Sequence, residues 1–147
     1  MTTSPRASAL ALAFWVGAGA VAGGLARALL GSWFGSGLGL PSELATLFVN
    51  LTGSFAIGLW SALTGPDGRL LVGTRRRQFV ATGLCGGYTT FSLFSFETIE
   101  LWRGGAPLLA AGYASATLLG ALVAVWAGYA SGLWLSRPRG ARAATRG

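Results

Sequence analysis

The sequence predicts an all-α membrane protein with four transmembrane helices. Of its 147 residues, 52% are hydrophobic and only 10% are charged, whereas soluble globular proteins have about 25% charged residues. A soluble domain of this length needs a charged surface around its core, and this chain cannot supply one. Its apolar residues also gather into four segments, each near the ~20 residues that span the hydrocarbon of a bilayer.

The four segments are joined by short connections and form a single domain over residues 1–136. We expect the spans at about residues 9–30, 42–63, 78–101 and 108–135. Glycine and proline mark the turns between them, as in Gly65-Pro66-Asp67-Gly68. Residues 137–147 are predicted to form a basic, disordered cytoplasmic tail.

A signal peptide is the alternative interpretation of the first segment, because Arg6 precedes it. Its apolar stretch is longer than the roughly 7–15 residues of a signal-peptide core, and further spans follow it. We therefore expect a retained helix. Gly19 and Gly23, four residues apart, give this helix a small-residue face that favours close packing against a neighbour.

The third segment is less apolar than the others and is predicted to be broken near the middle of the membrane. Gly83, Gly86 and Gly87 lie within five residues and are followed by Thr89 and Thr90, which is a poor sequence for a continuous helix. A broken helix is tolerated inside a membrane only where protein or water satisfies its backbone groups. Such breaks occur at ion sites because unwound carbonyls bind cations.

Two further groups of residues lie inside predicted spans and suggest an anion site. Thr46 and Asn50 share one helical face; an intramembrane Asn commonly joins helices, but its amide N–H can also bond an anion. Phe91 and Phe94 share a face just after the break, and the edge of a phenyl ring carries partial positive charge. Packing would explain the two phenylalanines alone, but their combination with the break and the hydroxyl residues is more specific.

The fourth segment carries no charge and has a small residue at every fourth position, which predicts close helix packing along one face. These positions are Gly112, Ala116, Gly120, Ala124, Gly128 and Gly132.

The charged residues predict topology rather than a nucleic-acid partner. Eleven basic residues, all arginine, outweigh four acidic ones and give a net charge of +7, a balance that also occurs in nucleic-acid-binding proteins. With four spans, however, most arginines fall on the side that holds both termini, and the positive-inside rule places that side in the cytoplasm of a cell-membrane protein. These arginines are Arg6, Arg69, Arg75, Arg76, Arg77, Arg137, Arg139, Arg142 and Arg146.

The residue types that are missing argue against an enzyme. The sequence has no His or Lys, and its one cysteine, Cys85, cannot form an internal disulfide. The four carboxylates are Glu43, Asp67, Glu97 and Glu100. Glu97 and Glu100 lie toward the end of the third span, where a solvated face at the membrane interface is the simple interpretation; a pore exit is the alternative for Glu97.

Three runs of residues resemble the Fluc/CrcB family of fluoride channels. They are GLCGGYTTFSLF at residues 83–94, NLTGSF at 50–55 and GGLAR at 23–27. The number, length and order of the spans agree as well, so the resemblance covers nearly the whole chain.

The resemblance implies a passive, fluoride-selective channel that lets cytoplasmic fluoride leave down its electrochemical gradient and so lowers its toxicity. It implies an antiparallel dimer with two pores and a structural Na⁺ at its centre, held by the backbone carbonyls of Gly86 and Thr89. The residues that it places on the anion path are Asn50, Phe91, Phe94, Thr46, Tyr113, Thr117 and Arg27, the last as a vestibule arginine. Ala121 departs from the family, which often has Ser there.

The arginine distribution bears on that dimer. Nine arginines on one side and at most two on the other, Arg27 and Arg103, predict a largely single orientation. An antiparallel dimer would then require an oppositely oriented homologue as the partner, that is, a heterodimer.

Two other functions compete with the channel. A small proton-coupled multidrug exporter is also a four-span dimer, but it needs a membrane-embedded carboxylate, and the first, second and fourth spans have none deep inside. A structural or assembly protein of the membrane would show no ion flux.

Overall fold

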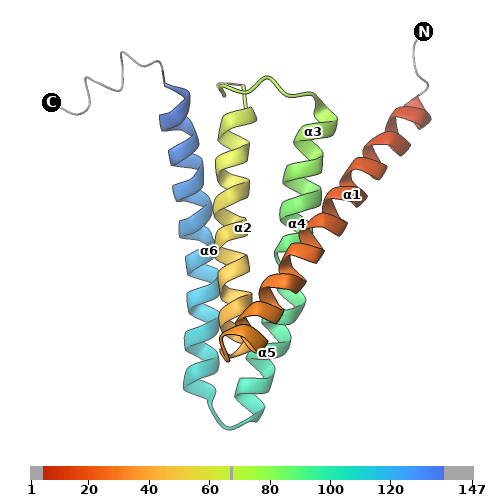
Figure 1. The fold of residues 1–147 in the computed structure, drawn as a ribbon. Helices are drawn as coiled ribbons and strands as arrows, with labels where there is room; N and C mark the ends of the chain where they lie inside the picture. The colour runs from red at the N-terminus through yellow and green to blue at the C-terminus, as the bar shows by residue number, and fades with distance from the viewer. Residues whose placement is uncertain (1–4, 67, 138–147) are drawn as a thin grey trace, which may run out of the picture.

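A computed structural model describes residues 5–66 and 68–137 of the chain (Figure 1). Asp67 and the predicted tail beyond Arg137 lie outside the described residues. The described part is helical, without strands. Its elements in chain order are α1 (Pro5–Ser32), the π-helical η1 (Trp33–Gly37), α2 (Ser42–Thr64), α3 (Thr74–Gln78), the π-helical η2 (Phe79–Leu84), α4 (Cys85–Tyr88), α5 (Phe91–Arg103) and α6 (Pro107–Ser136).

Four membrane crossings were predicted, and the structure has four. Three are continuous helices long and apolar enough to span a bilayer, over Ser8–Gly37, Ser42–Thr64 and Pro107–Ser136. The remaining crossing is made in pieces by α3, η2, α4 and α5. The predicted all-α fold with a broken third span is therefore confirmed.

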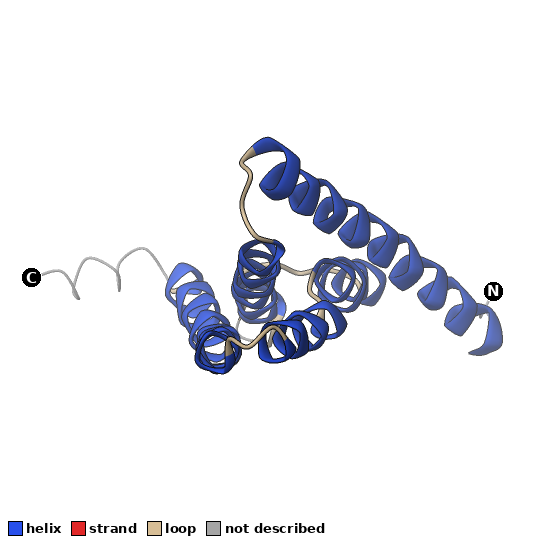
Figure 2. Ribbon diagram, turned by 90° about the horizontal axis from the view of Figure 1, so that it is seen from below, coloured by secondary structure: helices blue, strands red, loops and turns tan. Residues whose placement is uncertain are grey.

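The crossings alternate in direction, so the two ends of the described chain lie at the same end of the bundle (Figure 1). α2 and α6 run side by side, and α1 crosses the outside of the bundle at a slant (Figures 1 and 2). The start of α1, the 65–73 connection, α3 and the end of α6 share one end, and the 104–106 connection lies at the other.

The small residues of α6 fall into two halves with different surroundings. Gly128 and Gly132 are buried against α2, and a Cβ on Gly128 would overlap the carbonyl oxygen of Phe55. A Cβ on Gly112, in contrast, would meet nothing within 4 Å. Close backbone packing therefore unites α2 with the second half of α6 only.

α1 packs on the third crossing through glycines on both sides. A Cβ on Gly83 would lie 2.6 Å from the carbonyl oxygen of Val16, and one on Gly23 would lie 2.7 Å from the amide nitrogen of Tyr88. Both distances are far shorter than van der Waals contact. Only glycine lets the two backbones approach this closely.

The interruption of the third crossing falls on the threonines and not on the glycines. Gly83 lies within η2, and Gly86 and Gly87 lie within α4. Thr89 and Thr90 are extended, with ψ angles of 158° and 124°. The glycines were expected to weaken the helix, but two of them serve close packing against α1, and the chain leaves the helical conformation only after Tyr88.

Candidate functional site

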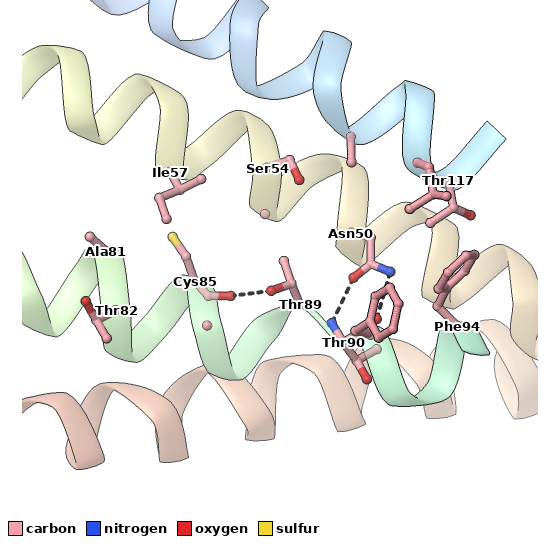
Figure 3. Close-up of a pocket in the computed structure, with 15 residues that line it drawn as sticks. Asn50, Ser54, Ile57, Ala81, Thr82, Cys85, Thr89, Thr90, Phe94 and Thr117 are labelled. Atoms are coloured by element: carbon pink, nitrogen blue, oxygen red, sulfur yellow. Dashed lines mark hydrogen bonds between the residues drawn. The ribbon is translucent and has the colours of Figure 1, made fainter. Parts of the chain in front are cut away.

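The side chain of Asn50 holds the break from the α2 side (Figure 3). Its Oδ1 accepts the backbone N–H of Thr90 at 2.8 Å, and its Nδ2 donates to the backbone carbonyl of Thr90 at 3.0 Å. Asn50 is buried. One amide thus replaces hydrogen bonds that the chain loses by leaving the helix, which is the condition for a break inside a membrane.

The threonines complete the local hydrogen bonding. The hydroxyl of Thr90 accepts the backbone N–H of Leu93 at 3.2 Å and caps the start of α5. The backbone N–H and the hydroxyl of Thr89 both donate to the carbonyl of Cys85, each at 3.0 Å (Figure 3). The two threonines therefore end one helix and begin the next within two residues.

These hydrogen bonds affect the backbone carbonyls of Gly86 and Thr89, which are the two predicted sodium ligands. In a continuous α-helix, the carbonyls of Gly86 and Thr89 would accept the N–H groups of Thr90 and Leu93. Here those N–H groups bond to Asn50 Oδ1 and Thr90 Oγ1 instead. The carbonyl oxygens of Gly86 and Thr89 are thus released from regular helical bonding, and carbonyl oxygens suit a hard cation. The donor set fits the predicted ion.

The backbone near Thr89 is also shaped by α2. Gly53 faces the break, and a Cβ there would overlap the Thr89 side chain and come within 3.1 Å of the Tyr88 ring. The hydroxyls of Thr52 and Tyr88 are 3.0 Å apart and hydrogen-bonded. Two adjacent positions of α2, Thr52 and Gly53, therefore serve this part of the third crossing together with Asn50.

A cavity of about 510 Å³ adjoins the break. Of the predicted site residues it brings together Asn50, Gly86, Thr89, Phe91, Phe94 and Thr117. Ala121, the position that departs from the family, also lines it. None of the described residues that line the cavity is charged.

The two phenylalanines differ sharply in exposure. Phe94 is 6% exposed and Phe91 is 73% exposed, and their ring centroids are 5.5 Å apart in a tilted arrangement. The Phe94 ring also lies 5.6 Å from that of Tyr113. Phe94 is thus fixed inside the bundle, whereas most of Phe91 is uncovered in a single chain.

Thr117 supplies an unusual hydroxyl beside these rings. Its side chain is 3% exposed, and among the described residues its Oγ1 is the one buried side-chain atom for which the structure gives no hydrogen-bond partner. Such an atom costs about 1–3 kcal/mol unless something satisfies it. Because Thr117 lines the cavity, a water molecule or an ion in the cavity is the natural partner.

Glu97 lies inside the bundle, so the simple interpretation of a solvated interfacial face is wrong for this residue. It is 6% exposed. The hydroxyl of Thr46 donates to its Oε1 at 3.0 Å, and the hydroxyl of Tyr113 donates to its Oε2 at 2.6 Å. The carboxyl group therefore joins α2, α5 and α6, while Glu100 is exposed, as expected.

A second cavity, of about 450 Å³, is lined by two of the remaining predicted residues. Arg27, Thr46 and Glu97 line it, together with Ser32 and Ser42. Tyr113 lines neither cavity; it lies between Phe94 and Glu97. The predicted anion path is thus divided into a neutral part at the break and a charged part beyond it.

The comparisons with known proteins agree with this architecture. Residues 14–129 match the family described as CrcB-like protein, Camphor Resistance (CrcB), and the chain belongs to this family. It is a multi-pass membrane protein.

Several relatives share the greater part of the chain. A "Fluoride-specific ion channel FluC 1" of Bradyrhizobium diazoefficiens is 52% identical over 115 residues, 78% of this chain and 80% of the relative. A protein of the same name in Rhodopseudomonas palustris is 51% identical over 125 residues, 85% of this chain and 89% of the relative. The "Fluoride-specific ion channel FluC" of Methylocella silvestris is 38% identical over 127 residues, 86% of this chain and 97% of the relative.

Proposed function

We propose that the chain forms a passive, fluoride-selective ion channel that exports cytoplasmic fluoride, and that it is not an enzyme. Family membership and the names of its relatives support this function. The observation in the structure that supports it best is the buried Thr117 hydroxyl without a protein partner, which lines an uncharged cavity together with Asn50 and Phe94. A small, strongly hydrated anion needs such donors when it leaves water.

The anion is held without a full positive charge beside it. Phenyl edges carry partial positive charge, and the Phe91 and Phe94 rings lie at the cavity with the Thr117 hydroxyl. Asn50 Nδ2 has a second N–H besides the one given to Thr90. Weak donors of this kind let an ion enter and also leave, which conduction requires.

Beyond the neutral cavity, the path continues past charged and hydroxyl groups. Arg27 draws anions toward the mouth by its positive charge, because a charged residue at a low-dielectric opening concentrates counter-ions. Thr46, Tyr113 and Glu97 form one hydrogen-bonded group on this path.

A structural Na⁺ would be held by the backbone carbonyls of Gly86 and Thr89. The N–H groups that would bond these carbonyls in a regular helix have other partners, and this supports the assignment. Among the described residues there is no group of three or more His, Cys, Asp or Glu that could hold a metal, which leaves carbonyl oxygens as the ligands. One chain provides two of them, fewer than a hard cation needs, so a second chain contributes the rest.

The second chain packs antiparallel against the face that carries the first cavity. In a single chain, Phe91 is 73% exposed and Thr82 and Gly86 are also exposed on this side. Polar groups that face lipid are costly, whereas a second chain would cover them and complete the cavity. Antiparallel packing on this face would bring the breaks of the two chains together.

The partner is an oppositely oriented homologue rather than a second copy of this chain. Within the described residues, the end of the bundle that holds both chain ends also holds six arginines, and Arg103 lies at the other end. The six are Arg6, Arg69, Arg75, Arg76, Arg77 and Arg137. This bias supports cytoplasmic termini in the cell membrane and a single orientation for this chain.

Fluoride efflux from liposomes tests the function directly. Vesicles loaded with fluoride should release it in the absence of a proton gradient when they contain the purified protein together with its oppositely oriented homologue, and chloride-loaded vesicles should not release chloride. A proton-coupled exporter would release little fluoride without the gradient, and a structural protein would release none. The double variant Phe91→Ile with Phe94→Ile should reduce the rate; unchanged efflux in it would remove the rings from the path.

The heterodimer is tested separately. A tag at the C-terminus should be accessible from the cytoplasmic side only, and the chain purified alone should conduct poorly until the oppositely oriented homologue is added. Equal labelling from both sides, or full conduction by the chain alone, would show a homodimer instead.

A further inference from the structure

The side chain of Arg27 reaches the break from the α1 side. Its Nε donates to the backbone carbonyl of Gly87 at 3.3 Å, across 60 residues of sequence. In a continuous helix this carbonyl would accept the N–H of Phe91, but the extended backbone at Thr89 and Thr90 separates the two groups. The guanidinium therefore supplies a hydrogen bond that the break takes away.

The position of Arg27 is set by close backbone packing. Gly19, Gly23 and Arg27 follow one another at intervals of four and so share a face of α1. A Cβ on Gly87 would come within 2.8 Å of Ala20 Cα, and a Cβ on Gly23 would overlap the Leu84 carbonyl oxygen. Since neither backbone can be displaced toward the other, the distance from α1 to Gly87 is fixed before the arginine side chain is considered.

Gly86 and Gly87 face different surroundings, although they are neighbours. Gly87 is pressed against α1, whereas a Cβ on Gly86 would meet nothing within 4 Å, and Gly86 lines the first cavity. A hydrogen bond to the Gly87 carbonyl on the α1 side therefore restrains the peptide unit between Gly87 and Tyr88, which lies between the carbonyls of Gly86 and Thr89 along the chain. Asn50 restrains Thr90 from the α2 side, so the break is held from two helices.

We propose that Arg27 is a positioning residue for the break: its Nε–H holds the Gly87 carbonyl and thereby keeps the Gly86 and Thr89 carbonyls directed to the ion site. This inference rests on the proposed channel function. It differs from the vestibule role, because there only the positive charge of Arg27 matters, whereas here the hydrogen-bond donor at one atomic position matters.

Three substitutions separate the two roles, because they differ at the atom that replaces Nε. Arg27→Gln places an amide nitrogen at the same distance along the side chain and removes the charge. Arg27→Lys keeps the charge but places a methylene group there. Arg27→Met removes the charge and places a methyl group there. The donor and the charge are thus varied independently.

If Arg27 positions the break, the rate of fluoride efflux should depend on whether the side chain at residue 27 has an N–H donor at the position of Nε. Arg27→Gln should lose only the part of the efflux that depends on the charge, and Arg27→Met should be roughly tenfold slower than Arg27→Gln, because a membrane hydrogen bond is worth up to about 1.7 kcal/mol and 1.4 kcal/mol is a factor of ten. Arg27→Lys should fall below Arg27→Gln. Wild-type efflux for Arg27→Lys, with Arg27→Gln as slow as Arg27→Met, would show that the charge alone matters and would overturn the proposal.

Hydrogen–deuterium exchange gives a readout that does not depend on flux. Amides of residues 88–93 should exchange faster in Arg27→Met than in the wild type and should be protected again in Arg27→Gln. Equal protection in all three variants would also overturn the proposal. If Arg27→Met does not fold, the comparison of Arg27→Gln with Arg27→Lys decides by itself. If the wild type conducts no fluoride, the proposed function fails while exchange still tests the contact.

Discussion

Replacing Asn50 by leucine removes both hydrogen bonds that hold Thr90, and the structure gives the size of the effect. Leucine has the branched shape of asparagine but a larger volume, so crowding at this buried position adds to the effect of the lost hydrogen bonds. Two bonds are lost, at 2.8 and 3.0 Å. Hydrogen bonds between membrane helices average about 0.6 kcal/mol and reach about 1.7 kcal/mol each.

The loss from Asn50→Leu should therefore be roughly 1–3 kcal/mol in the free energy of unfolding, or roughly 5- to 150-fold in the equilibrium constant. The residues that should exchange faster are those around Thr90, because its N–H and carbonyl lose their partner. Fluoride efflux should fall as well. Titration with SDS, followed by circular dichroism, measures the unfolding, and liposome efflux measures the function.

Thr117→Val is the matched control for Asn50→Leu. The Thr117 hydroxyl has no protein partner among the described residues, and valine has the same shape, so stability should be unchanged or higher. Efflux should nevertheless fall, because the donor at the cavity is lost. If Asn50→Leu leaves the unfolding free energy within about 0.5 kcal/mol of the wild type, the usual range of neutral substitutions, Asn50 does not hold the break and acts on the anion alone.

Three further predictions concern the packing of α1, the hydrogen bond to Glu97 and the buried ring of Phe94. Gly23→Ala should prevent assembly, because its methyl group overlaps a backbone carbonyl, whereas Gly24→Ala, with 4.0 Å of room, should give a normal yield of folded protein on size-exclusion chromatography; equal yields would contradict the α1 contact. Tyr113→Phe should lower stability by about 0.6–1.7 kcal/mol, the range for a hydrogen bond between membrane helices, in the same SDS titration, and no change would mean that the Glu97 bond contributes nothing. Phe94→Ile, at a buried position, should slow efflux more than 10-fold without changing the chloride control, and a rise in chloride release would point to a widened path instead.

The sequence predicted the crossings of the membrane well, because length and hydropathy depend only on local composition. It also predicted that the third crossing is interrupted just before Phe91, although only the two threonines of the predicted stretch leave the helical conformation. Glycine weakens a helix in isolation, but Gly83 and Gly87 remain helical because α1 packs directly on their backbones. Helix propensity considers each segment by itself, whereas here the packing of α1 keeps these glycines helical.

The sequence predicted most residues of the candidate site, but it predicted only some of their hydrogen-bond partners. Asn50 was expected near the anion, and the structure uses its amide on the Thr90 backbone. Glu97 looked like an interfacial residue because it lies near the end of its span, yet it is buried between Thr46 and Tyr113. Such pairings join residues 16 and 51 positions apart, and no local pattern in one sequence specifies them.

The segmented third crossing has a consequence for how the chain is made. Its backbone is satisfied at the break by Asn50 on α2 and, near it, by Arg27 on α1. A ribosome completes α1 and α2 before this segment emerges, so both helices can already lie in the bilayer when the segment needs their donors and acceptors. If the order of the helices were reversed, the bare peptide groups of the segment would enter lipid without partners. The succession of helices along the chain therefore matches the order in which their hydrogen bonds are required.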